Sequence, residues 1–369
     1  MRKVLGLLMA GTLFGCSEGA KNVEETVLLS ATRALAGKHC ESSAILNMLN
    51  YQGYSVSEQQ IIGAGSTLGF MFEKGDFPFL GSRNLEMRDE AFSNLGISWQ
   101  GNNSDKNRGW EDILKILKED NPVVLRVDMR YLPYLYGGKY GSRYMSFGWH
   151  MICLFGIDGE KQTAIVTDTA QKGFQEIALK DLWKARFSDT KVLPPGGEYY
   201  WVEKAPSQFL PEWDQIALNS LRKVSHNMVN CPIEGDVLAG LEGMKDFPGT
   251  IANLQNQVPS YLMGHVLPHM AGCIESFGTG GAAFRQMYGE FLSERAKEGG
   301  NPALKTAADK LSLAEEFWHR LAEELTTLSE QKKILKNKEA LKGELLRISE
   351  TARNLYLLEK DFYEYAGTL

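Results

Sequence analysis

The sequence has few of the residues that bind metal ions in proteins. Its 369 residues include five cysteines and six histidines, and they contain neither a Cys-x-x-Cys pair nor a His-Glu-x-x-His motif. The turn Gly278-Thr279-Gly280-Gly281 is not followed by Gly-Lys-Ser or Gly-Lys-Thr, so it is not a nucleotide-binding P-loop. We therefore expect neither a metal ion nor a cofactor.

The chain also has no excess of positive charge. The formal net charge is -6 at pH 7, and no basic cluster with interleaved aromatic residues marks a nucleic-acid surface. These features exclude nucleic acid as an expected partner. With 43% hydrophobic and 23% charged residues, the chain has a globular composition and is long enough for two domains with separate cores.

The N-terminus lacks the run of about 20 apolar residues that a spanning helix needs. Arg2 and Lys3 precede a shorter apolar run that ends in Leu13-Phe14-Gly15-Cys16, which resembles a bacterial lipobox despite the large Phe14. We predict that residues 1–16 are a signal peptide, that Cys16 is lipidated and that residues 17–36 form a tether. The protein would then be a lipoprotein anchored on the periplasmic side of a membrane. The alternative is that this run is the first helix of a cytoplasmic protein.

Cys40 stands where an apolar pattern of helical period begins. Ala44, Ile45, Met48 and Leu49 share one face of the predicted helix. A thiol at a helix N-terminus meets unpaired backbone N–H groups and the positive end of the helix dipole, which favour the thiolate. Cys40 is therefore a candidate nucleophile; a buried structural cysteine is the alternative.

His150 and Asp168 lie on two predicted strands, residues 149–156 and 163–168, on either side of a turn at Ile157-Asp158-Gly159-Glu160-Lys161. A hairpin centred on Gly159 would place them directly opposite each other, with Cβ atoms about 5 Å apart. A carboxylate beside an imidazole orients the ring and supports its charged form, as in a nucleophilic triad. A shift of one residue would put the two side chains on opposite faces.

The other cysteines receive structural roles. Cys153 lies on the buried strand and is expected in the core. Cys231 and Cys273 lie in the second half of the chain and can form a disulfide in an oxidising compartment.

Helix and strand signals alternate from Cys40 to about Trp201. They include a capping box at Ser55-Val56-Ser57-Glu58, a helix at residues 110–118 and strands at residues 122–127 and 199–202. This pattern predicts an α+β catalytic domain over residues 37–205. The Tyr- and Gly-rich segment 131–144 is a candidate wall of an acceptor site. After a linker at residues 206–211, the pattern is helical, which predicts an all-helical domain over residues 212–369.

The glycine-rich turn of that second domain is a candidate substrate-binding element. Gly278, Gly280 and Gly281 precede a predicted helix at residues 282–292, and Arg285 lies in its first turn. Free N–H groups at such a helix start can bind a phosphate or carboxylate, to which Arg285 would add charge. A tight turn that permits close packing of helices is the alternative.

Several of these motifs together resemble the BtrH-like family, named for an acyltransferase of butirosin biosynthesis. The resemblance rests on His39-Cys40 through Gly53, 57–65, Leu68-Gly69-Phe70, Gly81-Ser82-Arg83, 121–128, Leu132-Pro133-Tyr134, Trp149-His150, 182–186 and 274–288. It implies a papain-like cysteine fold in which Cys40, His150 and Asp168 are catalytic, followed by a helical domain. It also implies transfer of an acyl group from an acyl-carrier-protein thioester to an amine. The glutamine that papain-like peptidases place before the cysteine is absent, since Ala34 and Leu35 occupy that region, so the oxyanion donors must differ.

Three functions remain open from the sequence. A cytoplasmic protein can meet an acyl-carrier protein and act as an acyltransferase on a small-molecule or peptide amine. An exported lipoprotein cannot meet that carrier, which favours a cysteine amidase or peptidase. A catalytically silent binding protein with the same fold is the third possibility.

Overall fold

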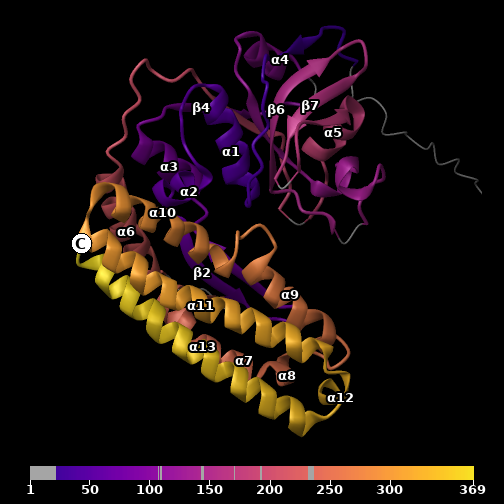
Figure 1. Cartoon of the computed structure of the whole chain (residues 1–369). Helices are drawn as coiled ribbons and strands as arrows, with labels where there is room; N and C mark the ends of the chain where they lie inside the picture. Colours follow the sequence, from indigo (N-terminus) through magenta and orange to yellow (C-terminus); the bar gives the residue numbers. More distant parts are fainter. Residues whose placement is uncertain are drawn as a thin grey trace, which may run out of the picture.

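The computed structural model describes residues 22–369 except 107, 109, 143–144, 170, 192 and 232–236. The predicted signal peptide, with Cys16, lies outside the described residues. Figure 1 shows an elongated molecule in which a sheet flanked by helices adjoins a long helical part. Within the part of the chain that the structure describes, no helix combines the length and the apolar character needed to cross a membrane.

The larger sheet carries the strands that were predicted around His150. Its strands follow the order β4-β9-β5-β6-β7-β8, and β1 pairs with the second half of β6. These strands are β1 (Val27–Leu28), β4 (Trp99–Asn103), β5 (Val123–Val127), β6 (His150–Asp158), β7 (Thr163–Thr167), β8 (Gln175–Ala178) and β9 (Glu198–Val202). All nine residues of β6 are buried, because helices cover both faces of the sheet.

Strand β1 corrects the expectation of a plain tether over residues 17–36. Val27 and Leu28 pair with Ile157 and Gly156 of β6, and the N–H of Leu29 donates to the carbonyl of Phe155. The far half of a buried strand needs partners for its backbone groups, and this segment supplies them.

Helices pack on the two faces of this sheet and create two cores. Helix α1 (Cys40–Tyr51) lies against the face that carries Met151, Cys153 and Phe155. Helices α4 (Glu111–Lys118) and α5 (Leu179–Arg186) cover the other face, with Ile152 and Leu154. The antiparallel sheet and its helices confirm the predicted α+β class.

The helical part is built around two long helices. Its helices are α6 (Trp213–Val229), α7 (Gly240–Ala252), α8 (Leu254–Gln257), α9 (Met263–Glu275), α10 (Arg285–Gly299), α11 (Pro302–Glu330), α12 (Lys332–Leu335) and α13 (Lys338–Gly367). One short strand, β10 (Val237–Ala239), makes this part not wholly helical. It pairs with the hairpin of β2 (Leu68–Glu73) and β3 (Phe79–Arg83).

That hairpin joins the two halves of the chain. Figure 1 shows β2 lying among the helices of the C-terminal half, where Phe70 and Phe72 contact Phe247 of α7. Helix α2 (Glu58–Ala64) packs on α10, and Gly63 has no room for a Cβ because the Phe291 ring fills that space. The division at residues 206–211 stays a prediction, and the largest hydrophobic core extends across it.

A buried ion pair lies where the hairpin meets the long helices. The Arg285 guanidinium and the Glu359 carboxylate are fully buried and form two bonds, Nε to Oε1 at 2.7 Å and Nη2 to Oε2 at 3.0 Å. Nη1 of Arg285 donates to the carbonyls of Gly69 and Ser82, and Trp318 Nε1 donates to Glu359 Oε1. The pair thus connects α10, α11 and α13 with both strands of the hairpin.

Replacement of Glu359 with Ala should destabilise the whole fold, because it leaves a buried guanidinium without its counter-charge. We expect the free energy of unfolding to fall by about 3 to 5 kcal/mol, measured by urea unfolding. Glu364→Ala, at an exposed position of the same helix, is the matched control and should change it by less than about 0.5 kcal/mol. Equal effects of the two substitutions would contradict this role.

Candidate active site

Cys40 is the first residue of α1, as predicted. The helix begins after His39, which has an extended conformation. The buried Glu58 carboxylate accepts hydrogen bonds from the backbone N–H groups of Lys38 and His39 and from the Ser42 hydroxyl. The next N–H, that of Cys40, has no acceptor among the described residues, so it remains available at the helix start.

Glu58 is a residue whose role the sequence prediction missed. The predicted capping box at 55–58 is wrong by two residues, because the box consists of Ser57 and Gln60. Glu58 takes no part in this capping box, and its carboxylate binds the loop before Cys40 instead. Gly37 faces it, and a Cβ there would lie 2.9 Å from Glu58 Oε1 and 2.7 Å from the Ser43 side chain, so only glycine fits without rearrangement.

His150 and Asp168 meet, although not in the predicted register. The imidazole Nε2–H donates to Asp168 Oδ1 at 2.7 Å. Near the turn Asp158 pairs with Thr163 and Gly156 with Ile165, whereas beyond Phe155 the pairs are Leu154 with Val166 and Cys153 with Thr167. The predicted direct cross-strand pair is therefore wrong: the two residues are diagonal neighbours on one face.

The bulge at Phe155 is what brings them to the same face. The register at the turn, continued without interruption, would place His150 and Asp168 on opposite faces, since each shift of one residue reverses a face. The extra residue in β6 shifts the register by one, which returns His150 and Asp168 to the same face of the sheet. Bulges leave little signal in a sequence, so this feature was not predictable from the residue pattern.

Asp168 is held by three donors. Besides His150, Oδ1 accepts from the backbone N–H of Thr169 at 2.6 Å, and Oδ2 accepts from the Tyr134 hydroxyl at 2.8 Å. Tyr134 belongs to η2 (Pro133–Tyr136), within the Tyr-rich segment that was expected to line an acceptor site. Burial, together with the Asp168 charge, raises the pKa of Tyr134 well above 10, so it stays a donor to the carboxylate.

The loop that leads to His150 is organised by a second buried carboxylate, Asp128. It accepts from the hydroxyls of Ser146 at 2.6 Å and Ser188 at 2.7 Å and from the backbone N–H of Phe147 at 3.1 Å. These bonds fix the chain between β5 and β6, so the strand that carries His150 begins in a defined place.

His150 also meets Cys40. Burial of the ring lowers its pKa, but the charge and hydrogen bond of Asp168 and those of Cys40 outweigh burial and raise the pKa from 6.5 to about 10. Because Asp168 occupies Nε2, Nδ1 is the ring nitrogen that remains for the thiol. The arrangement can take a proton from a thiol and return it to a leaving group.

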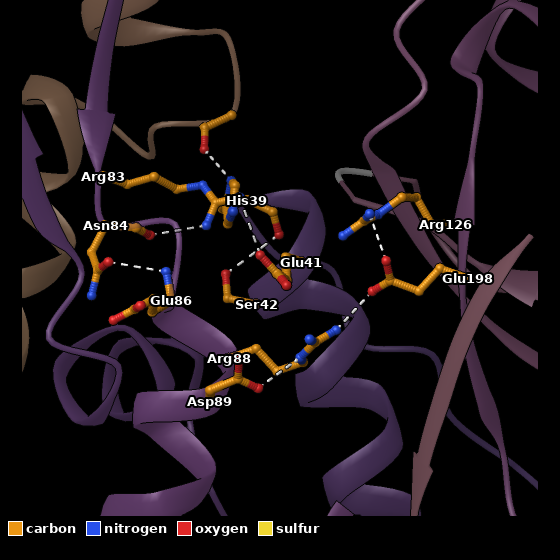
Figure 2. Close-up of polar contacts among 11 residues, drawn as sticks. His39, Glu41, Ser42, Arg83, Asn84, Glu86, Arg88, Asp89, Arg126 and Glu198 are labelled. Atoms are coloured by element: carbon orange, nitrogen blue, oxygen red, sulfur yellow. Dashed lines mark hydrogen bonds and ion pairs between the residues drawn. The ribbon is translucent and has the colours of Figure 1, made fainter. Parts of the chain in front are cut away.

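Ion pairs join the start of α1 to β3, and the strands β5 and β9 to a neighbouring helix. Figure 2 shows Arg83 of β3 beside His39 and directed at Glu41, and it shows Arg88 and Arg126 on either side of Glu198. The distances are 3.2 Å for Arg83 to Glu41, 2.9 Å for Arg88 to Glu198 and 2.5 Å for Arg126 to Glu198. Glu198 therefore links α3 (Met87–Leu95), which carries Arg88, with β5 of the sheet.

His39 connects the nucleophile loop with the glycine-rich turn. Its Nδ1–H donates to the carbonyl of Gly278 at 2.8 Å, and its ring contacts Phe284 edge-on at 5.0 Å. Burial and the neighbouring Arg83 keep the pKa of His39 well below 6.5, so the ring is neutral. Gly280 packs against Met287 and Lys38, and Gly281 against Gln286.

Arg285 cannot serve the anion site that was predicted for it. Its five N–H donors are committed to Glu359, Tyr363 and the carbonyls of Gly69, Ser82 and Ala283. The turn Gly278 to Gly281 instead holds His39 and permits close packing, the alternative reading of the sequence. We therefore remove Arg285 from the candidate site.

The other cysteines that the structure describes are not part of this centre. Cys153 is buried in the core, as expected. The possible disulfide between Cys231 and Cys273 is absent, because Cys273 is a thiol that faces His269 Nε2 at 3.7 Å. No group of residues suited to a metal ion occurs in the described ranges.

Two family models match the chain. The family described as Butirosin biosynthesis protein H, N-terminal, matches residues 39–169, a span that contains Cys40, His150 and Asp168. A Domain of unknown function (DUF4872) matches residues 180–365, half of the chain. The chain belongs to the BtrH-like family. No curated protein matches it. Membership in the BtrH-like family indicates an acyltransferase-related function.

The raised pKa of His150 predicts a pH-dependent stability. The folded-state pKa lies above the 6.5 of the unfolded chain, so the charged ring stabilises the fold fully below about pH 6.5 and loses this effect as the pH rises towards about 10. Urea unfolding of wild type and His150→Gln should show a difference in free energy that shrinks over this range. In an Asp168→Asn background this shrinkage should largely vanish; its persistence would contradict the assignment to Asp168.

Proposed function

We propose that this BtrH-like protein transfers an acyl group through a covalent intermediate on Cys40. The observation that carries the proposal is the convergence of the Cys40 thiol and the Asp168 carboxylate on one buried imidazole, His150. Cys40, His150 and Asp168 act as nucleophile, acid–base and orienting group. The donor is a thioester and the acceptor is an amine.

The first half-reaction forms the acyl-enzyme. His150, whose pKa is raised to about 10, already holds the proton of the Cys40 thiol, and the Cys40 thiolate attacks the thioester carbonyl. The backbone N–H of Cys40 is a donor for the oxyanion, since Glu58 accepts from the preceding N–H groups and no described residue accepts from this one. The C–S bond of the donor then breaks, and His150 protonates the departing thiolate to give a free thiol.

The second half-reaction releases the acyl group. An amine attacks the carbonyl of acyl-Cys40 while His150 accepts its proton, and the Cys40 sulfur leaves as thiolate. Asp168 stabilises the imidazolium in both steps, and Tyr134 keeps Asp168 in place. Water in place of the amine would give hydrolysis, the amidase alternative.

The decisive test is acylation of Cys40 by a small acyl thioester, followed by intact mass and peptide mapping. We expect one acyl adduct on Cys40 that disappears on addition of an amine, and none in Cys40→Ala. Cys231→Ala is the matched control and should be acylated like wild type. Release by water alone would favour a hydrolase, and absence of any adduct would favour a silent binding protein.

Tyr134→Phe tests the support of Asp168 without changing the reacting groups. Loss of a hydrogen bond to a charged acceptor is worth about 1.5 to 3 kcal/mol, so we expect the acylation rate of Cys40 to fall by about tenfold or more. Tyr140→Phe, in the same segment but bonded to Asp181, should leave the rate near wild type. Equal rates in both variants would show that Tyr134 is not needed.

A further inference from the structure

A cluster of lysines occupies one end of the helical part, away from the candidate active site. Lys332, Lys333, Lys336, Lys338 and Lys342, which we call the lysine tip, surround α12 between the two longest helices. Figure 1 shows α12 at the end of the helical part remote from α1 and β6. Helix α11, with 29 residues, is about 44 Å long, so the tip is held well away from the larger sheet.

The five side chains are exposed and their charges are not neutralised locally. No carboxylate among the described residues lies within ion-pair distance of any of them, whereas many other lysines of the chain, such as Lys305 and Lys310, form such pairs. Residues 331–342 carry five lysines and one glutamate, a formal charge of +4, while the whole chain carries -6. The remainder therefore carries -10, and the molecule is strongly polarised.

The surroundings of the lysine tip combine amide, hydroxyl and apolar groups. A hollow of about 760 Å³ is lined by residues 255–261 together with Lys336 and Lys338. Tyr261 at its edge is 77% exposed, and Gln255 Oε1 is a buried acceptor without a partner. An aromatic ring with a polar end beside lysines suits the interface between lipid headgroups and acyl chains.

We propose that the lysine tip docks on the surface of an anionic lipid bilayer. Clusters of four to eight basic residues are typical of peripheral contact with anionic lipids. Protein–protein interfaces are instead depleted in lysine and enriched in arginine, and residues 331–342 contain no arginine. The negative remainder of the molecule is repelled by such a surface, which orients the protein with its tip towards the lipid.

The full-length chain, prepared without lipid on Cys16, tests this directly in co-sedimentation with vesicles. Phosphatidylcholine vesicles that contain phosphatidylglycerol should bind it, vesicles of phosphatidylcholine alone should not, and binding should weaken steeply with salt. Each lysine near the surface contributes an affinity of about fivefold. Replacement of all five lysines of the tip with Gln should therefore abolish measurable binding.

A charge-matched variant separates position from net charge. Lys139, Lys172, Lys180, Lys191 and Lys297 are exposed elsewhere and likewise form no described ion pair, and their replacement with Gln changes the net charge equally. This variant should bind nearly as wild type. Circular dichroism would verify folding of both variants, and Lys332→Gln/Lys333→Gln, with about a 25-fold expected loss, is a milder substitute.

Two results would overturn the proposal. The first is no sedimentation of wild type with the anionic vesicles at low salt, whether or not the tip then binds an acidic protein. The second is equal binding by the tip variant and the charge-matched variant. Because no step of this test involves Cys40, it is independent of the proposed acyl transfer.

Discussion

The pair of Arg285 and Glu359 is the interaction on which the two halves of this protein depend. It buries two opposite charges where α10 and α13 meet the base of the β2–β3 hairpin, and the hairpin in turn presents Arg83 to Glu41, beside Cys40. The glycine-rich turn before α10 adds a second connection through His39. The region matched by the domain of unknown function therefore supports the loop that places the candidate nucleophile.

The local features of the site were predictable because short sequence patterns encode them. The start of α1 at Cys40 follows from the onset of helical periodicity after a glycine, and the burial of β6 follows from an uninterrupted apolar run. The pairing of β6 with β7 follows from the turn around Gly159. Each inference needs only residues that are neighbours in the sequence.

The predictions that were wrong, and the roles that were missed, all depend on residues distant in the sequence. The bulge at Phe155 lies between the residues of β6 that pair with β5 and those that pair with β1, and its effect on the face of His150 cannot be read from alternation. Arg285 was predicted to bind an anion because its actual partner, Glu359, lies 74 residues away and could not be recognised from the sequence. Glu58 and Tyr134 likewise act on groups that only the fold brings near them. Their charges and hydroxyls were visible in the sequence, but their partners were not.

The polar groups of the site are of two kinds: those that take part in the proposed reaction, and those that fix the structure around it. Asp128, Glu58 and the pair of Arg285 and Glu359 are buried and saturated with hydrogen bonds, so moving any of them would expose an uncompensated charge. The backbone N–H of Cys40, by contrast, has no acceptor in the described part of the chain. Rigid surroundings with an unpaired N–H donor at the nucleophile stabilise the negative charge that develops on a substrate oxygen more than they stabilise the uncharged ground state.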